Sequence, residues 1–139
     1  MGIRVVISGS NDEIILENDR ILDANFISDT VDESTARATE INVGLELIGK
    51  VTNEKDDMTK KLCLWSLVPS ELEDAYRKLS LEVILAGTVV RKINLPNAFI
   101  VDYKESFSVK NGSGVFTLIL KQKKEKISAI TIEGGYNAS

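Results

Sequence analysis

The sequence predicts one mainly β domain, of barrel or sandwich type, with a single helical region near the middle of the chain. Apolar and polar side chains alternate from Ile41 to Val51, which is the period of a half-buried strand. Turn-forming residues separate β-branched runs at residues 9–12 and 111–114, which is typical of hairpins. Apolar residues with helical spacing lie between Met58 and Leu79. Long strands with few helices are typical of large curved sheets and barrels.

The first four predicted strands come from short β-rich runs. Residues 4–8 (RVVIS) and 13–17 (EIILE) are joined by a turn-forming tetrapeptide, so we expect a hairpin to open the chain. Residues 21–28 (ILDANFIS) predict a third strand. The alternating segment 41–51 is the fourth, and Gly49 shares the parity of its apolar residues.

Two polar segments flank the fourth strand. Residues 29–40 are long for a connection within a compact domain, and loops of that length usually carry function. Residues 52–57 precede a helix that we expect to begin near Met58. Acidic and hydroxyl side chains satisfy the free backbone N–H groups at a helix start. The candidate capping residues are Asp56, Asp57 and Thr59.

The predicted helix buries Leu62 and Trp65, and we interpret Trp65 as a core anchor rather than a platform for a ligand. Pro69 interrupts this helix because it has no backbone N–H to donate. Ser70 and Glu73 have the spacing of a capping box, so we expect a second helical turn to follow. Its apolar stripe consists of Leu72, Ala75, Tyr76 and Leu79.

The last third of the chain predicts a β-ladder. Residues 79–95 contain two strands that reverse at Ala86-Gly87. A new strand is entered at Pro96, turns at residues 111–114 and returns as a long second strand. A short final strand follows, after which Gly134-Gly135 is expected to loosen the chain before its tail.

Composition and cysteine content favour a single soluble domain over residues 1–139. The apolar content of 43% and the charged content of 27% are ordinary for a globular protein. No apolar run is long enough for a membrane span or a signal peptide, so we expect synthesis in the cytoplasm. Cys63 is the single cysteine, which excludes an intramolecular disulfide, and we expect a buried thiol.

The net charge of −4 is unevenly distributed along the chain. Residues 1–57 hold 13 acidic and 5 basic side chains, a balance of −8, whereas residues 58–139 hold 8 and 12, a balance of +4. Two complementary faces on one molecule suit head-to-tail self-association. The alternative is two solvated faces that bind no partner.

Residues for catalysis or cofactor binding are scarce. Histidine is absent, so neither Cys63 nor any serine has the usual base to activate it. The acidic pairs do not match the ligand spacing of a calcium loop, and no glycine loop has a phosphate-binding signature. The lysine-rich run 121–126 lacks the aromatic residues typical of nucleic-acid modules, and lysines also protect exposed strand edges. We therefore predict no catalytic residue, no metal and no cofactor.

The order of elements, ending in IVDYKESFSVKNGSGVFTLILKQKKEK at residues 100–126, resembles the tube proteins of contractile phage tails. Their relatives include the hemolysin-coregulated protein of type VI secretion. Four further phrases resemble a group of small clostridial proteins of this type: ATEINVGLELIGKV, LWSLVPSE, VVRKINLPNAFIVDY and TIEGGY.

This resemblance implies a tail-tube fold and a structural, non-enzymatic subunit that self-assembles into rings, commonly of six, which stack into a hollow tube. Sheath and baseplate proteins are the implied further partners, with nucleic acid only as cargo in the lumen, and the product is an assembled tail-like particle. We expect the contacts between stacked rings to involve the loops at residues 29–40 and 51–57, with the lysine-rich run 121–126 as the opposing surface. The candidate interface residues are Asp29, Asp32, Glu33, Arg37, Asp56, Asp57, Lys121, Lys123, Lys124 and Lys126.

Two other functions are consistent with the residues. One is a monomeric β-domain that binds a protein or peptide along the edge formed by residues 121–126. The other is a hydrolase of unfamiliar type, which ranks last because only carboxylates and lysines are present as bases.

Overall fold

The computed structural model describes residues 1–17, 19–30, 41–53, 55 and 57–138. Within this part of the chain nine strands, one α-helix and two short 3-10 helices alternate, so the mainly β prediction is confirmed. The strands are β1 (Gly2–Ser8), β2 (Glu13–Leu16), β3 (Ile21–Thr30), β4 (Ile41–Val51), β5 (Arg77–Leu85), β6 (Thr88–Ser108), β7 (Ser113–Gln122), β8 (Thr131–Glu133) and β9 (Tyr136–Asn137). The helices are α1 (Thr59–Ser66), η2 (Glu73–Ala75) and η3 (Lys124–Ala129).

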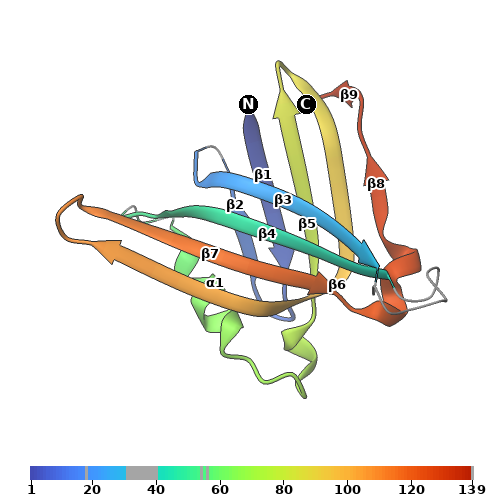
Figure 1. Cartoon of the computed structure of the whole chain (residues 1–139), viewed down its shortest axis with the longest axis horizontal. Helices are drawn as coiled ribbons and strands as arrows, with labels where there is room; N and C mark the ends of the chain where they lie inside the picture. The colour runs from blue at the N-terminus through green and yellow to red at the C-terminus, as the bar shows by residue number, and fades with distance from the viewer. Residues whose placement is uncertain (18, 31–40, 54, 56, 139) are drawn as a thin grey trace.

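Strand β6 joins two parts of one antiparallel sheet, whose order is β2-β1-β5-β6-β7-β4-β3. Its first part, up to Ala98, pairs with β5 and also with β8 and β9. From Ala98 to Ser108 it pairs with β7. We call β2, β1, β5 and the first part of β6 the first half-sheet, and the rest of β6 with β7, β4 and β3 the second half-sheet. The strands of the two half-sheets cross at a steep angle (Figure 1).

The prediction that a new strand begins at Pro96 is wrong, because β6 continues through this residue. Proline cannot donate a ladder hydrogen bond and is tolerated within sheets at bulges. The β5–β6 register shifts at this point, from Leu79 opposite Leu95 to Arg77 opposite Ala98. Pro96 lies in that irregularity, where β6 leaves one half-sheet and enters the other.

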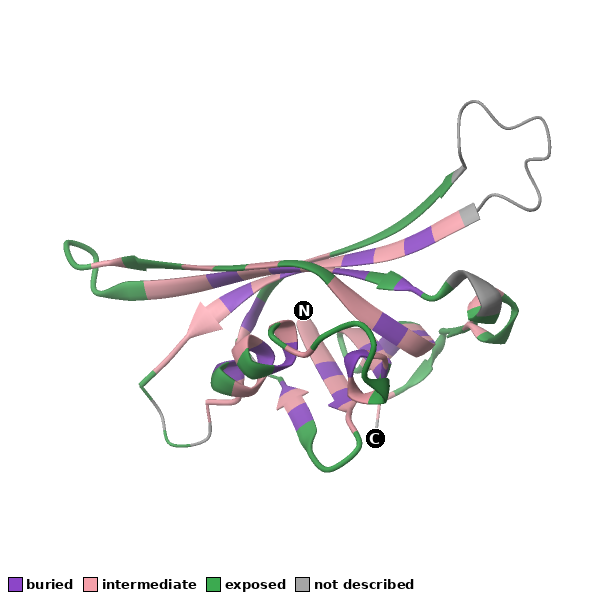
Figure 2. Cartoon of the chain, turned by 90° about the horizontal axis from the view of Figure 1, so that it is seen from below, coloured by how far each residue is buried: buried purple, intermediate pink, exposed green. Residues whose placement is uncertain are grey.

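The core lies between the half-sheets, and α1 closes one side of it (Figure 2). Trp65 is buried, and its indole N–H donates to the Ala75 carbonyl oxygen at 3.1 Å, so the core-anchor interpretation is confirmed. The alternation predicted for β4 is confirmed as well, with Ile48 on the opposite face. Cys63 is half-buried rather than fully buried. The buried apolar residues of the two half-sheets include Val5, Ile7, Leu16, Leu79, Leu81, Ile93, Leu95, Val43, Leu45, Leu47, Phe116, Leu118 and Leu120.

A second helical turn does follow Pro69, but it is only the short 3-10 helix η2, and the apolar helical stripe predicted to continue to Leu79 is wrong. Only the three residues of η2 are helical, Tyr76 is extended, and β5 begins at Arg77. Leu79 is fully buried because it pairs with Ile7 on one side and Leu95 on the other. Sheet pairing therefore overrides the helical spacing of the local apolar stripe.

The C-terminal segment also differs from prediction. β7 ends at Gln122 and Lys124 begins η3, so the lysine-rich run does not form one exposed strand. The tail is held by β6 and the turn before it. The Gly135 N–H donates to the Val89 carbonyl oxygen and the Ala138 N–H to the Gly87 carbonyl oxygen, each at 2.8 Å. Gly134 packs on the backbone of Val90, where a Cβ would lie 2.3 Å from the carbonyl oxygen.

Asp57 ties the start of α1 to the end of β4. The N-cap residue of α1 is Met58, and Asp57, one residue earlier, satisfies a free N–H at the helix start as predicted. One carboxylate oxygen accepts from the Thr59 N–H at 3.0 Å, and the other accepts from the Thr52 N–H at 2.9 Å. The Thr59 hydroxyl donates to the same carboxylate. Asp56 lies outside the described residues.

Replacing Asp57 with alanine is expected to lower the free energy of unfolding by about 1–2 kcal/mol, because a capping acceptor is lost. Urea denaturation of the purified protein measures this loss. Asp57→Asn keeps one acceptor oxygen and serves as the matched control, with a smaller expected loss. Equal stability of Asp57→Ala and the wild type would contradict the capping role.

Candidate assembly surfaces

The second half-sheet ends in two open strand edges. Among the described residues, β3 pairs only with β4, and residues 99–108 of β6 pair only with β7. An unpaired edge presents a row of backbone N–H and C=O groups that can extend a sheet into another chain. These two edges lie on opposite sides of the same four strands.

Among the residues that the structure describes, no other element covers one face of the second half-sheet, which we call the uncovered face. The first half-sheet and the helices lie on its other side (Figure 2). Glu46 lies on the uncovered face, because it alternates with the buried residues of β4. The register places Asn25 and Ile119 opposite Glu46, so both lie on this face too. The charged residues on this face are Asp23, Asp29, Glu46, Asp102, Lys50, Lys104 and Lys121. Acidic and basic side chains therefore nearly balance on it.

The β6–β7 hairpin extends beyond the rest of the molecule (Figure 1). Its pairing continues to Ser108 opposite Ser113, so the predicted turn is displaced from residues 111–114 to residues 109–112. Gly112 has a φ of +61°, and the Ser108 hydroxyl oxygen accepts from the Asn111 N–H at 3.2 Å. Val109 at the tip is 100% exposed.

A buried arginine links the β1–β2 turn to η2 and β5, and sequence reasoning missed it. Arg77 is 5% exposed, donates to Asp74 at 2.6 Å and to Asp12 at 3.3 Å, and lies 5.1 Å from the ring centre of Trp65. No local sequence signal distinguishes it, since an arginine three residues after an aspartate is common on exposed surfaces.

Hydrogen bonding holds Asp74 in its charged form. The backbone N–H of Ser10 donates to it, and together with the Arg77 guanidinium this lowers the pKa of Asp74 below its usual range. A folded-state pKa below the unfolded value adds stability at neutral pH, and that stability is lost as the pH falls below about 4.

The structure places some predicted interface residues together at one end of the second half-sheet. Asp29 and Lys121 are exposed on its uncovered face, in neighbouring rows of the ladder. Lys123 follows, with its ammonium 4.8 Å from the Tyr76 ring centre, and exposed Lys126 lies on η3. These positions are compatible with a shared contact surface.

The remaining predicted interface residues do not join this group. Asp57 lies beyond the opposite end of β4, and its carboxylate is occupied by Thr52 and Thr59. The side chain of Lys124 is not among those described, and four residues lie outside the described chain altogether: Asp32, Glu33, Arg37 and Asp56.

Two other kinds of feature are absent from the described residues: a membrane-spanning helix and a metal-binding group. None of the helices there has the length and apolar character to cross a membrane. The same residues contain no group of three or more side chains placed to hold a metal ion. The candidate assembly features of the second half-sheet are the open edges, the uncovered face and the hairpin tip.

The topology is that of the tail-tube fold, and solved structures with this fold match nearly the whole chain. Hcp1 from Flavobacterium johnsoniae matches with a TM-score of 0.58 and 13% identity, over 97% of this chain and 99% of that chain. A chain of the anti-feeding prophage (AFP) baseplate matches with a TM-score of 0.56 and 15% identity, over 95% and 92%. A chain in the tail of an empty GTA particle, with C6 symmetry, matches with a TM-score of 0.52 and 9% identity, over 98% and 96%. These matches confirm the predicted tail-tube fold.

Neither the family models nor the curated proteins contain a match to this sequence.

Proposed function

We propose that this protein is a structural, non-enzymatic tube subunit of a tail-like injection particle. Copies join side by side into closed rings around a hollow lumen, and the rings stack. The observation that carries the proposal is the pair of open edges on a tail-tube fold. Solved structures with this fold include tail and baseplate assemblies.

Strand directions favour edge-to-edge joining. Neighbouring strands of the second half-sheet are all antiparallel, so its four strands alternate in direction. The open edge of β3 in one copy therefore runs antiparallel to the open edge of β6 in the next copy, which continues the same sheet. A head-to-tail contact of this kind forms a ring when its rotation closes, and closure removes both exposed edges. Six copies per ring are proposed, because the similar GTA tail has C6 symmetry.

The two faces of the subunit suit different surroundings. We assign the uncovered, nearly charge-balanced face to the lumen, where nucleic acid enters the proposal only as cargo. Contacts with sheath and baseplate proteins are assigned to the opposite side, where Leu64 on α1 and Leu67 just after it are exposed.

Lysines introduced on the two edges are expected to leave the protein monomeric, because charged side chains on an edge strand oppose pairing. The variant combines Ile27→Lys on β3 with Val101→Lys on β6, at two exposed positions. Mass photometry and negative-stain electron microscopy over a concentration series measure the result. Wild-type rings that disappear in this variant support the proposal.

Leu67→Lys is the matched control, because it places the same charge on an exposed leucine of the α1 side. This control is expected to form rings like the wild type. A wild type that stays monomeric at high concentration would overturn the proposal and favour a monomeric domain that binds a protein or peptide.

A further inference from the structure

The tip of the β6–β7 hairpin exposes apolar side chains beside a positive charge. Val109 is 100% exposed and Phe107 is 67% exposed, although burial of apolar side chains of this size is favourable. Lys110 follows Val109 directly and is exposed too. Within the described residues its ammonium forms no ion pair. This tip has the composition of a contact surface.

A cavity of about 60 Å³ lies beside α1, with Val68, Tyr76, Phe99 and Ile100 among its lining residues. Tyr76 and Phe99 meet edge to face, with their ring centres 5.8 Å apart. Tyr76 also lines a larger groove of about 450 Å³, so the cavity and the groove adjoin. Protein interiors seldom leave voids larger than a water molecule. This void has room for a small apolar side chain from another molecule.

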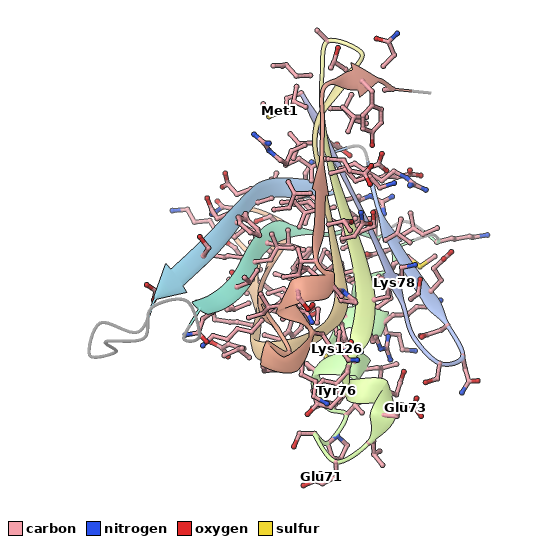
Figure 3. All side chains as sticks on the ribbon, turned by 90° about the vertical axis from the view of Figure 1, so that its right-hand side faces the viewer. Met1, Glu71, Glu73, Tyr76, Lys78 and Lys126 are labelled. Carbon is pink, nitrogen blue, oxygen red and sulfur yellow. The ribbon has the colours of Figure 1, made fainter. Side chains whose placement is uncertain are left out.

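The groove is acidic next to the cavity. Glu71 and Glu73 line it, and they lie near Tyr76 at the same end of the molecule (Figure 3). Neither carboxylate has an ion-pair partner in the described part of the chain. Lys123 is the single cation among the lining residues, so one negative charge is in excess.

The tip and the groove lie at opposite ends of one ladder. β6 and β7 pair from Ala98 opposite Gln122 to Ser108 opposite Ser113. Asn97 and Lys123, which line the groove, come just outside the first end, and Val109 comes just outside the second. A ladder of this length spans about 30 Å at roughly 3.3 Å per residue. The tip is therefore too distant to enter the groove of its own copy.

We propose that Val109 of one copy enters the cavity beside Tyr76 and Phe99 in the next copy, while Lys110 pairs with Glu71 and Glu73. An apolar projection that fits a pocket elsewhere on the same molecule makes a head-to-tail contact that propagates without closing. This contact joins copies along the direction of the β6 and β7 strands. The open edges instead join copies side by side, perpendicular to the strands. The contact therefore stacks one ring on the next, and this role rests on the proposed function above.

The test separates stacking from ring formation. Val109→Asp and Lys110→Glu are each expected to form normal rings but to shorten tubes at least tenfold in negative-stain images. Lys60→Glu is the matched control, because Lys60 is exposed and lines neither the cavity nor the groove. Adding Glu71→Lys and Glu73→Lys to Lys110→Glu restores opposite charges and is expected to restore tubes.

A mixing experiment tests the head-to-tail geometry. Ser70 lines both the cavity and the groove, which together we call the socket. Ser70→Trp is designed to block this socket while leaving the hairpin tip intact. Rings of Ser70→Trp alone and of Val109→Asp alone are expected to remain single. An equal mixture is expected to give ring pairs, since one variant supplies the tip and the other the socket. Circular dichroism verifies that each variant is folded.

The outcomes are distinct. Wild-type tubes that persist unchanged in Val109→Asp and Lys110→Glu overturn the stacking contact and leave the ring proposal intact. Failure of the charge swap or of the mixture to restore contacts, while rings still form, also overturns it. A wild type that forms no rings overturns both proposals.

Discussion

Replacing Arg77 with methionine is expected to destabilise the fold by about 3 kcal/mol. Breaking a buried ion pair by removing one partner costs about 3–5 kcal/mol, because the remaining charges lose their compensation. The lower end applies here, since the side chains of Asp12 and Asp74 remain 37% and 35% exposed. The Arg77 guanidinium also donates to the Asp74 carbonyl oxygen and covers the Trp65 ring. Guanidinium denaturation, with the slope held constant between variants, measures the effect.

Arg4→Met is the matched control. Arg4 forms ion pairs with Glu17 and Glu82, but its side chain is 40% exposed, and exposed pairs contribute at most about 1 kcal/mol. Arg77→Lys keeps the charge without the planar fork and is expected to fall between wild type and Arg77→Met. If Arg77→Met cost no more than Arg4→Met, the linking role of Arg77 would be refuted.

Local patterns predicted the elements whose burial follows from their own sequence. The alternation of β4 is visible because Val43, Leu45 and Leu47 all face the same core. The reversal at Ala86-Gly87 is visible because both residues adopt positive φ, of 50° and 78°, as a tight hairpin turn requires. Such features need no knowledge of distant neighbours.

Errors occurred where a distant strand decides the outcome. Leu79 fits a helical stripe by spacing, but its pairing with Ile7 and Leu95 makes it part of a strand. Pro96 was predicted to start a strand, but it lies within β6, at a shift in the β5–β6 register. Arg77 is buried by residues from the β1–β2 turn, α1 and η2, which no short window of sequence contains.

The candidate surfaces were less predictable than the fold. Whether a strand lies at an edge depends on the pairing of the whole sheet, so neither the open edge of β3 nor that of β6 has a local signal. Asp29 and Lys121 were predicted as interface residues from their charge, and the structure places both at one end of the uncovered face. Their part in assembly stays a prediction. The cavity beside Tyr76 could not be predicted from the sequence, because its lining residues come from several separate segments.

Phe116→Ala is expected to cost about 3–5 kcal/mol, the range for deleting a large buried aromatic side chain. Phe116 is fully buried, stacks with Tyr103 at a ring-centre distance of 6.4 Å, and lies opposite Gly49 in the β4–β7 ladder. Gly49→Ala disturbs the same contact from β4. The added Cβ would clash with the Phe116 ring and with the Arg20 carbonyl oxygen, at 2.5 Å from each. Overpacking of this kind costs about 1–3 kcal/mol. Urea denaturation measures both losses.

The double variant decides whether Gly49 and Phe116 act as a pair. Removing the ring removes one of the two clashes, so Gly49→Ala is expected to cost less in the Phe116→Ala background, with a coupling of at least about 0.5 kcal/mol. Strictly additive losses would contradict the pairing and leave the Arg20 carbonyl as the constraint on Gly49. The pair matters for assembly because a one-residue slip of β4 against β7 would turn the core residues of β4 to the uncovered face. The contact between Gly49 and the buried Phe116 ring therefore helps to fix the β4–β7 register, and the position of both open edges depends on that register.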